Sequence, residues 1–332
     1  MGYFFHQDPV NYLNSINGEN FDSIALELFR HQYAHNEVYR GFTDALGVQP
    51  EFVNDVSSIP FLPVSFFKTH DVITAEPGER DNVVFTSSST TSDVPARHIV
   101  NDIVLYDSNL LKGFRQFYGD PEEYVFLGLL PSYLQRGGSS LVYMVQKLME
   151  CSNIDMNGFY LDEREELFNV LNRLEADGRK YMLIGVTFGL LDFAERYQLE
   201  LVNGVVMETG GMKGRRKEMT REEVHNILKE RLGVTQVHSE YGMTELLSQA
   251  YAEKDGIFNT TSTMKVLVRD QNDPLELHRG GTGNLNIIDL ANVHSCAFIA
   301  TDDIGRIYDD GSFEVMGRSD NSALRGCNLM VV

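Results

Sequence analysis

The sequence predicts an α/β protein with a largely parallel sheet, followed by an antiparallel β part. The first observation is that short apolar segments alternate with amphipathic helical segments between residues 82 and 245. The second is a change near residue 263, after which short strand patterns are separated by Gly, Asn and Asp turns. The third is size, because 332 residues with 42% hydrophobic content can bury a large core.

Composition makes several classes of partner poor candidates. The net charge of −20 and the isoelectric point near 4.8 disfavour nucleic acid and anionic membranes. No apolar run approaches the length of a membrane span, and the first residues have neither a secretory leader nor a myristoylation signal. Cys151, Cys296 and Cys327 lie far apart without metal-type spacing, which predicts a reducing, cytoplasmic setting rather than disulfides.

The first predicted element is a long helix. Asn20 or Asp22 can cap it, and apolar residues recur at helical spacing to about Leu46. His31 and His35 are four residues apart on this helix, but no third ligand stands nearby in the sequence. We interpret them as surface histidines, because zinc normally needs three or four protein ligands.

Periodicity and turn signals predict the remaining elements. Helical spacing closed by a glycine predicts a helix over 162–177, and Thr220 with Glu223 makes a capping box for a helix to Leu232. The other predicted helices are 104–118, 139–149 and 189–197, and the strands of the α/β part are 82–85, 125–130, 180–186, 205–209 and 236–240. The antiparallel strands are 264–268, 283–290, 296–300, 305–308 and 312–316, with a hairpin turn at 309–311 and an irregular connection at 59–68.

A hydroxyl-rich stretch follows the first of these strands. Backbone N–H groups and hydroxyls after a strand can hold a triphosphate, and Arg97 would add positive charge. The alternative is a flexible Ser/Thr linker, although linkers seldom lie between two apolar segments. The stretch begins with Thr86, Ser87, Ser88, Ser89, Thr90 and Thr91.

The segment 238–245 has the composition of a nucleotide site at a strand end. Gly242 permits a tight turn after the strand. We expect Tyr241 to stack on a base, the Thr244 hydroxyl to bond a phosphate or carboxylate oxygen, and Glu245 to hold Mg²⁺. A strand followed by an ordinary polar turn is the alternative.

Taken together, these motifs resemble those of the AMP-forming acyl-activating (adenylate-forming) superfamily, and more closely its acyl-protein synthetase branch, the LuxE-like ligases. Residues 86–95 resemble the family's phosphate loop, 131–133 the start of its substrate-side motif, and 241–245 its adenylate and magnesium motif. Asp303 matches the carboxylate that binds both ribose hydroxyls, and 317–320 match the hinge signature.

The resemblance implies a fold and a division of the chain. The expected fold is the large N-terminal domain of an adenylate-forming enzyme, with mostly parallel sheets, flanking helices and an antiparallel β subdomain. The small mobile C-terminal domain with its catalytic lysine has no counterpart in this sequence, which stops at Val332. We expect an α/β adenylation core over 1–262, an antiparallel subdomain of the same core over 263–318, and a hinge remnant and tail over 319–332.

The resemblance also implies an activity: ATP- and Mg²⁺-dependent activation of a carboxylic acid, expected to be a long-chain fatty acid, to an acyl-adenylate. Acyl transfer to a protein thiol would follow, with handover to a reductase partner. The implied catalytic residues are Thr244, Glu245, Arg318 and, as acyl acceptor, Cys327, with Glu245 as the metal ligand. The implied nucleotide-binding residues are Thr86, Ser87, Ser88, Ser89, Thr90, Thr91, Gly210, Gly211, Tyr241, Gly242 and Asp303.

Three alternatives remain open at this point. The phosphate loop has Ser89 and Ser92 where the family carries glycines, and Arg97 or nothing in place of the usual lysine. One alternative is a non-catalytic binding or scaffold protein, which would fit these departures. A second is a phenylacetate-type coenzyme A ligase, which would share the same core. Cys327 could also be a small buried residue of the last turn.

Overall fold

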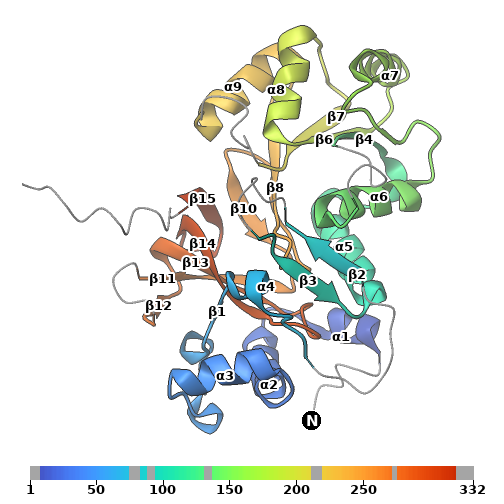
Figure 1. The fold of residues 1–332 in the computed structure, drawn as a ribbon. Helices are drawn as coiled ribbons and strands as arrows, with labels where there is room; N and C mark the ends of the chain where they lie inside the picture. The colour runs from blue at the N-terminus through green and yellow to red at the C-terminus, as the bar shows by residue number, and fades with distance from the viewer. Residues whose placement is uncertain are drawn as a thin grey trace, which may run out of the picture.

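Parallel strands carry the candidate site at their carboxyl ends. The computed structural model describes residues 8–74, 83–87, 94–130, 137–210, 219–270 and 275–318. Its parallel strands lie in the order β5, β4, β6, β7, β8 (Figure 1). They are β4 (Val125–Leu129), β5 (Gly158–Phe159), β6 (Tyr181–Gly185), β7 (Gly204–Glu208) and β8 (His238–Tyr241). The predicted α/β fold with a mostly parallel central part is therefore confirmed.

Helices cover both faces of these strands. In β6, Tyr181 and Leu183 belong to one core cluster, whereas Met182 and Ile184 belong to another. Alternate residues of a strand point to opposite faces, and burial of both faces explains the continuous apolar pattern of such strands. One cluster includes residues of α7 (Arg164–Ala176), α8 (Thr187–Arg196) and α9 (Arg221–Leu232), and the other includes residues of α5 (Ile103–Tyr118) and α6 (Ser140–Ser152).

The antiparallel strands continue the same sheet. β8 pairs with β9, and the order then runs β10, β15, β14, β13, β11, β12. The turn at 309–311 joins β14 to β15 as predicted, with the Tyr308 N–H donating to the Ser312 carbonyl at 2.8 Å. These strands are β9 (Ala250–Ala252), β10 (Ile257–Thr260), β11 (Met264–Arg269), β12 (Leu277–His278), β13 (Gly281–Asp289), β14 (Phe298–Ile307) and β15 (Phe313–Arg318). The domain boundary at residue 263 stays a prediction.

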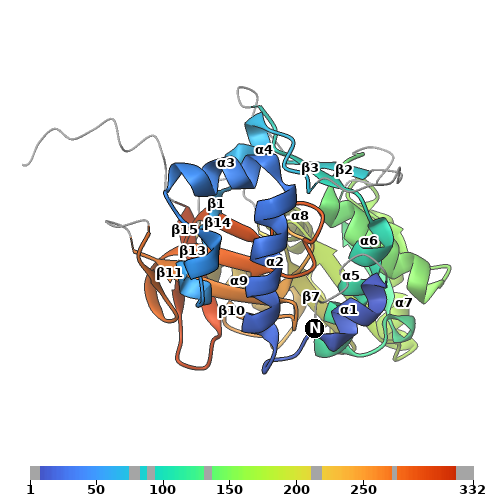
Figure 2. The ribbon, with the colours of Figure 1, turned by 90° about the horizontal axis from the view of Figure 1, so that it is seen from below.

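An N-terminal helical layer packs on the antiparallel strands (Figure 2). Phe29 and Tyr39 place their ring centroids 6.2 and 6.0 Å from that of Phe298 on β14. The layer contains α1 (Pro9–Ser15), α2 (Phe21–His35), α3 (Glu37–Ala45), η1 (Pro50–Phe52), η2 (Val56–Ser58), β1 (Leu62–Pro63) and α4 (Phe66–Thr69). The short helix η3 (Pro121–Glu123) precedes β4.

The prediction of a single long helix to Leu46 is wrong, because the helix is interrupted at Asn36. Asn36 has extended backbone, and its side chain accepts a hydrogen bond from the Tyr39 N–H at 2.9 Å, which caps α3. Its amide also donates to the Ser295 carbonyl at 3.0 Å. A buried tertiary contact thus fixes the break. The start of α2 at Phe21 agrees with the prediction, although Asn20 makes no side-chain cap bond there.

The strand predictions also need corrections. The two strands predicted at 296–300 and 305–308 are one strand, β14, with a register shift between Ile304 and Gly305. Cys296 precedes this strand rather than lying in it. The predictions missed the short strands β3 (Arg97–Val100), β5, β9, β10 and β12. They also treated 59–68 as irregular, although it contains β1 and most of α4.

Candidate active site

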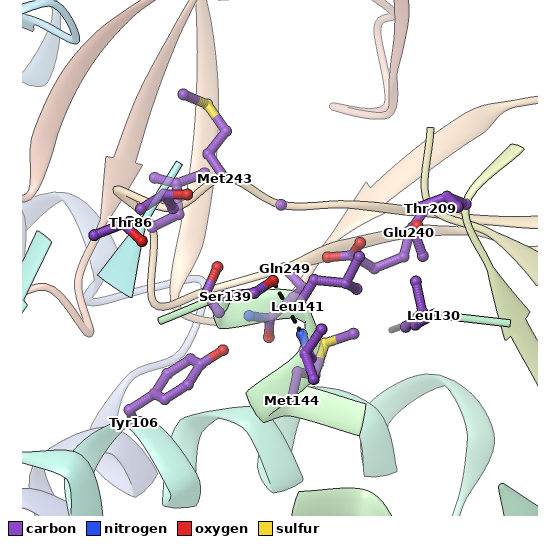
Figure 3. A pocket seen from close by; sticks show the side chains of 16 residues that line it. Thr86, Tyr106, Leu130, Ser139, Leu141, Met144, Thr209, Glu240, Met243 and Gln249 are labelled. Carbon is purple, nitrogen blue, oxygen red and sulfur yellow. Dashed lines mark hydrogen bonds between the residues drawn. The ribbon is translucent and has the colours of Figure 1, made fainter. Parts of the chain in front are cut away.

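A pocket of about 160 Å³ opens at the carboxyl ends of the parallel strands. Residues after β4, β6, β7 and β8 line one side, and the first turn of α6 lines another. Ligands of open α/β sheets bind at this edge, where loops leave the strands. The lining residues labelled in Figure 3 are Thr86, Tyr106, Leu130, Ser139, Leu141, Met144, Thr209, Glu240, Met243 and Gln249.

The predicted phosphate stretch begins in this pocket. Thr86 ends β2 (Val83–Thr86), which forms a hairpin with β3 (Arg97–Val100), and Thr86 lines the pocket. Ser87 closes the hairpin, because its Oγ accepts from the Ala96 N–H at 2.9 Å and its N–H donates to the Ala96 carbonyl at 3.0 Å. Arg97 points away to an exposed ion pair with Asp71 at 3.1 Å. The predicted site residues Ser88, Ser89, Thr90 and Thr91 lie outside the described residues.

The turn after β8 supplies Gly242, Met243 and Thr244 to the pocket. A turn follows at 244–245, and the backbone of Gly242 does not have a positive φ angle. A Cβ at position 242 would lie 2.5 Å from Oε1 of Glu240, so a larger residue would require the Glu240 side chain to move. His98 holds the turn in place, with Nδ1 2.8 Å from the Thr244 carbonyl oxygen.

Glu240 is a site residue that the sequence analysis missed. It lines the pocket, and Figure 3 shows its carboxyl group turned toward the pocket centre. Burial, and secondarily the charge of Glu208, raise the pKa of Glu240 to about 8. Its carboxyl group is therefore mostly protonated at neutral pH and can donate a hydrogen bond. Strand alternation was an available signal, because Glu240 must point opposite to Tyr241 on β8.

Glu208, at the end of β7, accepts hydrogen bonds from α8, from β8 and from the residues after β7. Its Oε2 accepts hydrogen bonds from Thr187 Oγ1 at 2.8 Å and from the Gly210 N–H at 3.0 Å. Its Oε1 accepts from Ser239 Oγ at 3.0 Å. Burial opposes ionisation of Glu208, but the nearby His225 imidazole and the Thr187 hydroxyl outweigh burial and lower its pKa to about 2. In the sequence, the signal for Glu208 is a carboxylate at the end of a buried strand, and the predictions did not include it. Gly210 follows the lining residue Thr209 but does not itself line the pocket, and Gly211 is outside the described residues.

A second group of predicted residues meets on the other face of β8. The Tyr241 hydroxyl donates to Asp303 Oδ2 at 2.8 Å, and Arg318 Nε donates to Asp303 Oδ1 at 2.9 Å. The Tyr241 ring is only 9% exposed and packs edge-on against Phe258 and Phe313, with centroid distances of 5.9 and 5.6 Å. Stacking of Tyr241 on a base stays a prediction, and the anchoring of its hydroxyl by Asp303 was not anticipated.

Glu245 lies close enough to Arg318 and Asp303 to feel their charges. Its side chain is 5% exposed, and its backbone carbonyl accepts a hydrogen bond from Asn292 Nδ2 at 2.8 Å. Burial raises the pKa of Glu245 to about 7, against the opposing influence of Arg318. A bound cation would favour the ionised form. Glu245 is not among the residues that line the pocket, and its role as magnesium ligand stays a prediction. The described part of the chain contains no group of three or more His, Cys, Asp or Glu side chains suited to a metal ion. Mg²⁺ sites with bound phosphates commonly use only one or two carboxylates.

The two described cysteines are poorly suited to nucleophilic attack. Burial raises the pKa of Cys296 to about 12, and burial also raises the pKa of Cys151 above its ordinary value. A thiol attacks as the thiolate, so both lose reactivity at neutral pH. Cys327, the substrate-side motif at 131–133 and the second half of the hinge motif lie outside the described residues.

The fold defines a structural class. The chain has the fold of the large N-terminal domain of adenylate-forming enzymes. It superposes on 2-hydroxyisobutyryl-CoA ligase bound to 2-HIB-AMP and CoA with a TM-score of 0.64, at 11% identity, covering 90% of this chain and 74% of that one. The ATP-bound MatB of Rhodopseudomonas palustris gives a TM-score of 0.54 at 17% identity over 74% of this chain. This chain spans about half, 50%, of that protein.

Within this class, the resemblance to the acyl-protein synthetases is confirmed. Residues 2–113 match the family described as acyl-protein synthetase, LuxE. A long-chain-fatty-acid–luciferin-component ligase of Vibrio harveyi is 24% identical over 323 residues, which cover 91% of this chain and 84% of the relative. Among the described helices, none combines the length and apolar character needed to cross a bilayer.

Proposed function

We propose that this protein activates a carboxylic acid with ATP and passes the acyl group to a thiol. The observation that carries the proposal is the joint placement of Thr86 and Thr244 in one pocket at the carboxyl ends of the parallel strands. The Asp303 carboxylate contacts Tyr241 of β8, whose side chain lies on the face of the strand opposite to that of Glu240. The relationship to acyl-protein synthetases supports the same conclusion.

In the first step, a carboxylate oxygen of the acid attacks the α-phosphorus of ATP. The new P–O bond forms as the bond to pyrophosphate breaks, so that an acyl-adenylate and pyrophosphate result. The chain's part is to position the reactants and to neutralise charge, since little covalent work falls to the protein in such transfers. We assign positioning to the Thr86 and Thr244 hydroxyls and charge neutralisation to Arg318.

Magnesium would be held by Glu245, and when bound it would neutralise charge on the phosphate oxygens. Asp303 would accept hydrogen bonds from the ribose hydroxyls. Each of its oxygens already accepts one bond, from Tyr241 or Arg318, and a carboxylate oxygen has lone pairs for another. We also assign nucleotide binding to Gly210 and Gly211, which follow the lining residue Thr209 in the sequence.

In the second step, a thiolate attacks the carbonyl carbon of the acyl-adenylate, and the bond to AMP breaks. The raised pKa values of Cys151 and Cys296 support Cys327 or a thiol on a partner protein as the acceptor. The long acyl chain rests on the name of the Vibrio harveyi relative, and the cytoplasmic setting rests on cysteine usage. Handover to a reductase rests on the resemblance to LuxE-like ligases alone.

The decisive experiment is carboxylate-dependent exchange of labelled pyrophosphate into ATP. The panel should contain saturated acids from acetate to myristate together with phenylacetate. We expect exchange that rises with chain length and requires Mg²⁺. Exchange greatest with phenylacetate, followed by thioester formation on coenzyme A, would instead favour the coenzyme A ligase. ATP binding without exchange for any acid would favour a non-catalytic binding protein.

A further inference from the structure

A second cavity lies between the N-terminal layer and the antiparallel strands. It has a volume of about 410 Å³ and shares no lining residue with the pocket at the parallel strand ends. Residues of α3, of the connection from η2 to β1, and of β11 to β14 line it. We call it the Arg269 cavity, after the one charged side chain among its described lining residues.

The lining of the Arg269 cavity is mostly apolar. Phe42 and Leu46 come from α3 and its end, and Ile59 and Phe61 come from the connection before β1. Ile59 and Phe61 are only 2% and 7% exposed, so the side chains that form this part of the wall are fixed by the core. An apolar cavity of this size is within the range of small-molecule sites, which commonly have a few polar groups at one position.

Arg269 supplies the charge. Its Nη1 donates to Asn286 Oδ1 at 3.0 Å and its Nη2 donates to the Thr301 carbonyl at 2.9 Å. Both acceptors are neutral, and the two bonds use two of the five N–H donors of a guanidinium group. Burial lowers the pKa of Arg269 from its ordinary value, while the charge of Asp302 acts in the opposite direction without cancelling the effect of burial. An anionic ligand group would compensate for the effect of burial.

We propose that the Arg269 cavity binds an unbranched carboxylic acid of medium chain length, with its carboxylate on Arg269 and its alkyl chain against Phe42 and Phe61. The apolar wall selects the chain, and the guanidinium selects the anionic head group. A volume of about 410 Å³ lies in the range of small-molecule sites, and dodecanoate serves as the medium-chain probe. This second acid site is independent of the proposed adenylation.

The absence of tryptophan from the sequence allows a local test. Phe42→Trp places a single indole in the wall of the Arg269 cavity. Sodium dodecanoate, added without ATP and below its micelle concentration, should change the indole emission in a saturable way. Dodecan-1-ol should bind at least tenfold more weakly, since it lacks the charge. Arg269→Gln in the Phe42→Trp background should weaken dodecanoate binding at least tenfold, and Arg269→Lys should weaken it less.

The control variant is Met243→Trp, which places the single indole beside the other pocket. A dodecanoate response from Met243→Trp with none from Phe42→Trp would overturn the proposal. Equal binding of dodecan-1-ol and dodecanoate to Phe42→Trp would do the same, and this comparison decides the matter even if Arg269→Gln fails to fold. Loss of pyrophosphate exchange would contradict the proposed adenylation but would not affect these binding results.

Discussion

The hydroxyl group of Tyr241 donates a 2.8 Å hydrogen bond to Oδ2 of Asp303, across 62 positions of sequence. The bond joins the end of β8 to β14, and Arg318 Nε completes the contact from β15 at 2.9 Å from Oδ1. Two motifs that the sequence analysis treated separately therefore form one unit. This unit fixes the orientation of the Asp303 carboxylate, which is the group proposed to bind the ribose.

We predict that Asp303→Ala weakens ATP binding by roughly 2 kcal/mol or more, because charge-assisted hydrogen bonds to the ribose hydroxyls are lost. Isothermal titration with ATP·Mg²⁺ measures this. Tyr241→Phe is the matched control, since it removes a partner of Asp303 without removing the carboxylate, and it should cost less. If Asp302→Ala costs more than Asp303→Ala, then Asp302 rather than Asp303 binds the nucleotide.

Glu245→Gln and Thr244→Ala should each abolish adenylate formation while leaving the fold intact. Glutamine keeps the shape of Glu245 but loses the charge that a magnesium ion needs, and alanine removes the proposed phosphate donor. Pyrophosphate exchange measures the activity, and thermal unfolding checks the fold. Activity within a few-fold of wild type in both variants would contradict the assignment.

The carboxyl group of Glu240 should make the protein less stable as pH rises. Its pKa in the folded protein is about 8, above the ordinary value of 4.5, so the folded state holds a proton that the unfolded state releases. The stabilisation is complete below pH 4.5 and is lost between about pH 4.5 and 8, with a limiting slope of about 1.4 kcal/mol per pH unit for one proton. Urea unfolding at pH 5, 6.5 and 8 measures the slope.

Glu240→Gln should make that pH dependence shallower, because glutamine does not titrate. The same variant keeps a hydrogen-bond donor in the pocket, so substrate binding at pH 7 should change little. An unchanged slope in Glu240→Gln would show that another group is responsible for the pH dependence.

Glu208 should have the opposite effect on how stability depends on pH. Its folded pKa of about 2 lies below the ordinary 4.5, so its contribution is present above pH 4.5 and is lost as pH falls toward 2. We expect Glu208→Gln to destabilise the protein by about 1–3 kcal/mol at pH 7, because buried donors lose a charged acceptor. It should also lower the pKa of Glu240, since Glu208 is one cause of the raised value. Urea unfolding of Glu208→Gln across the same pH series tests both effects.

Cys327 is predicted to be the acyl acceptor. Incubation with ATP, Mg²⁺ and myristate should give a mass increase equal to one acyl group, and hydroxylamine should remove it. Cys327→Ser should lose the adduct but keep pyrophosphate exchange, while Cys151→Ser serves as the matched control and should keep both. An adduct that persists in Cys327→Ser, or exchange without any adduct in wild type, would assign the acceptor to a different thiol.

The sequence by itself determined the elements that depend on local signals. The capping box of Thr220 and Glu223 begins α9 as predicted, and Gly233 ends it in the left-handed conformation. The alternation of apolar and amphipathic segments likewise determined the parallel strands and their flanking helices, because burial of both sheet faces requires that pattern. The motif around Thr244 was placed correctly at a strand end for the same local reason.

Only the tertiary structure decided which charged groups lie together and where the N-terminal helix is interrupted. The break at Asn36 depends on a bond to Ser295, which is 259 positions away, so no local pattern contains it. The raised pKa of Glu240 depends on burial and on Glu208, which lies on the neighbouring strand. Burial and electrostatic contact arise from packing between distant segments, and they set the protonation states on which the chemistry of the pocket depends.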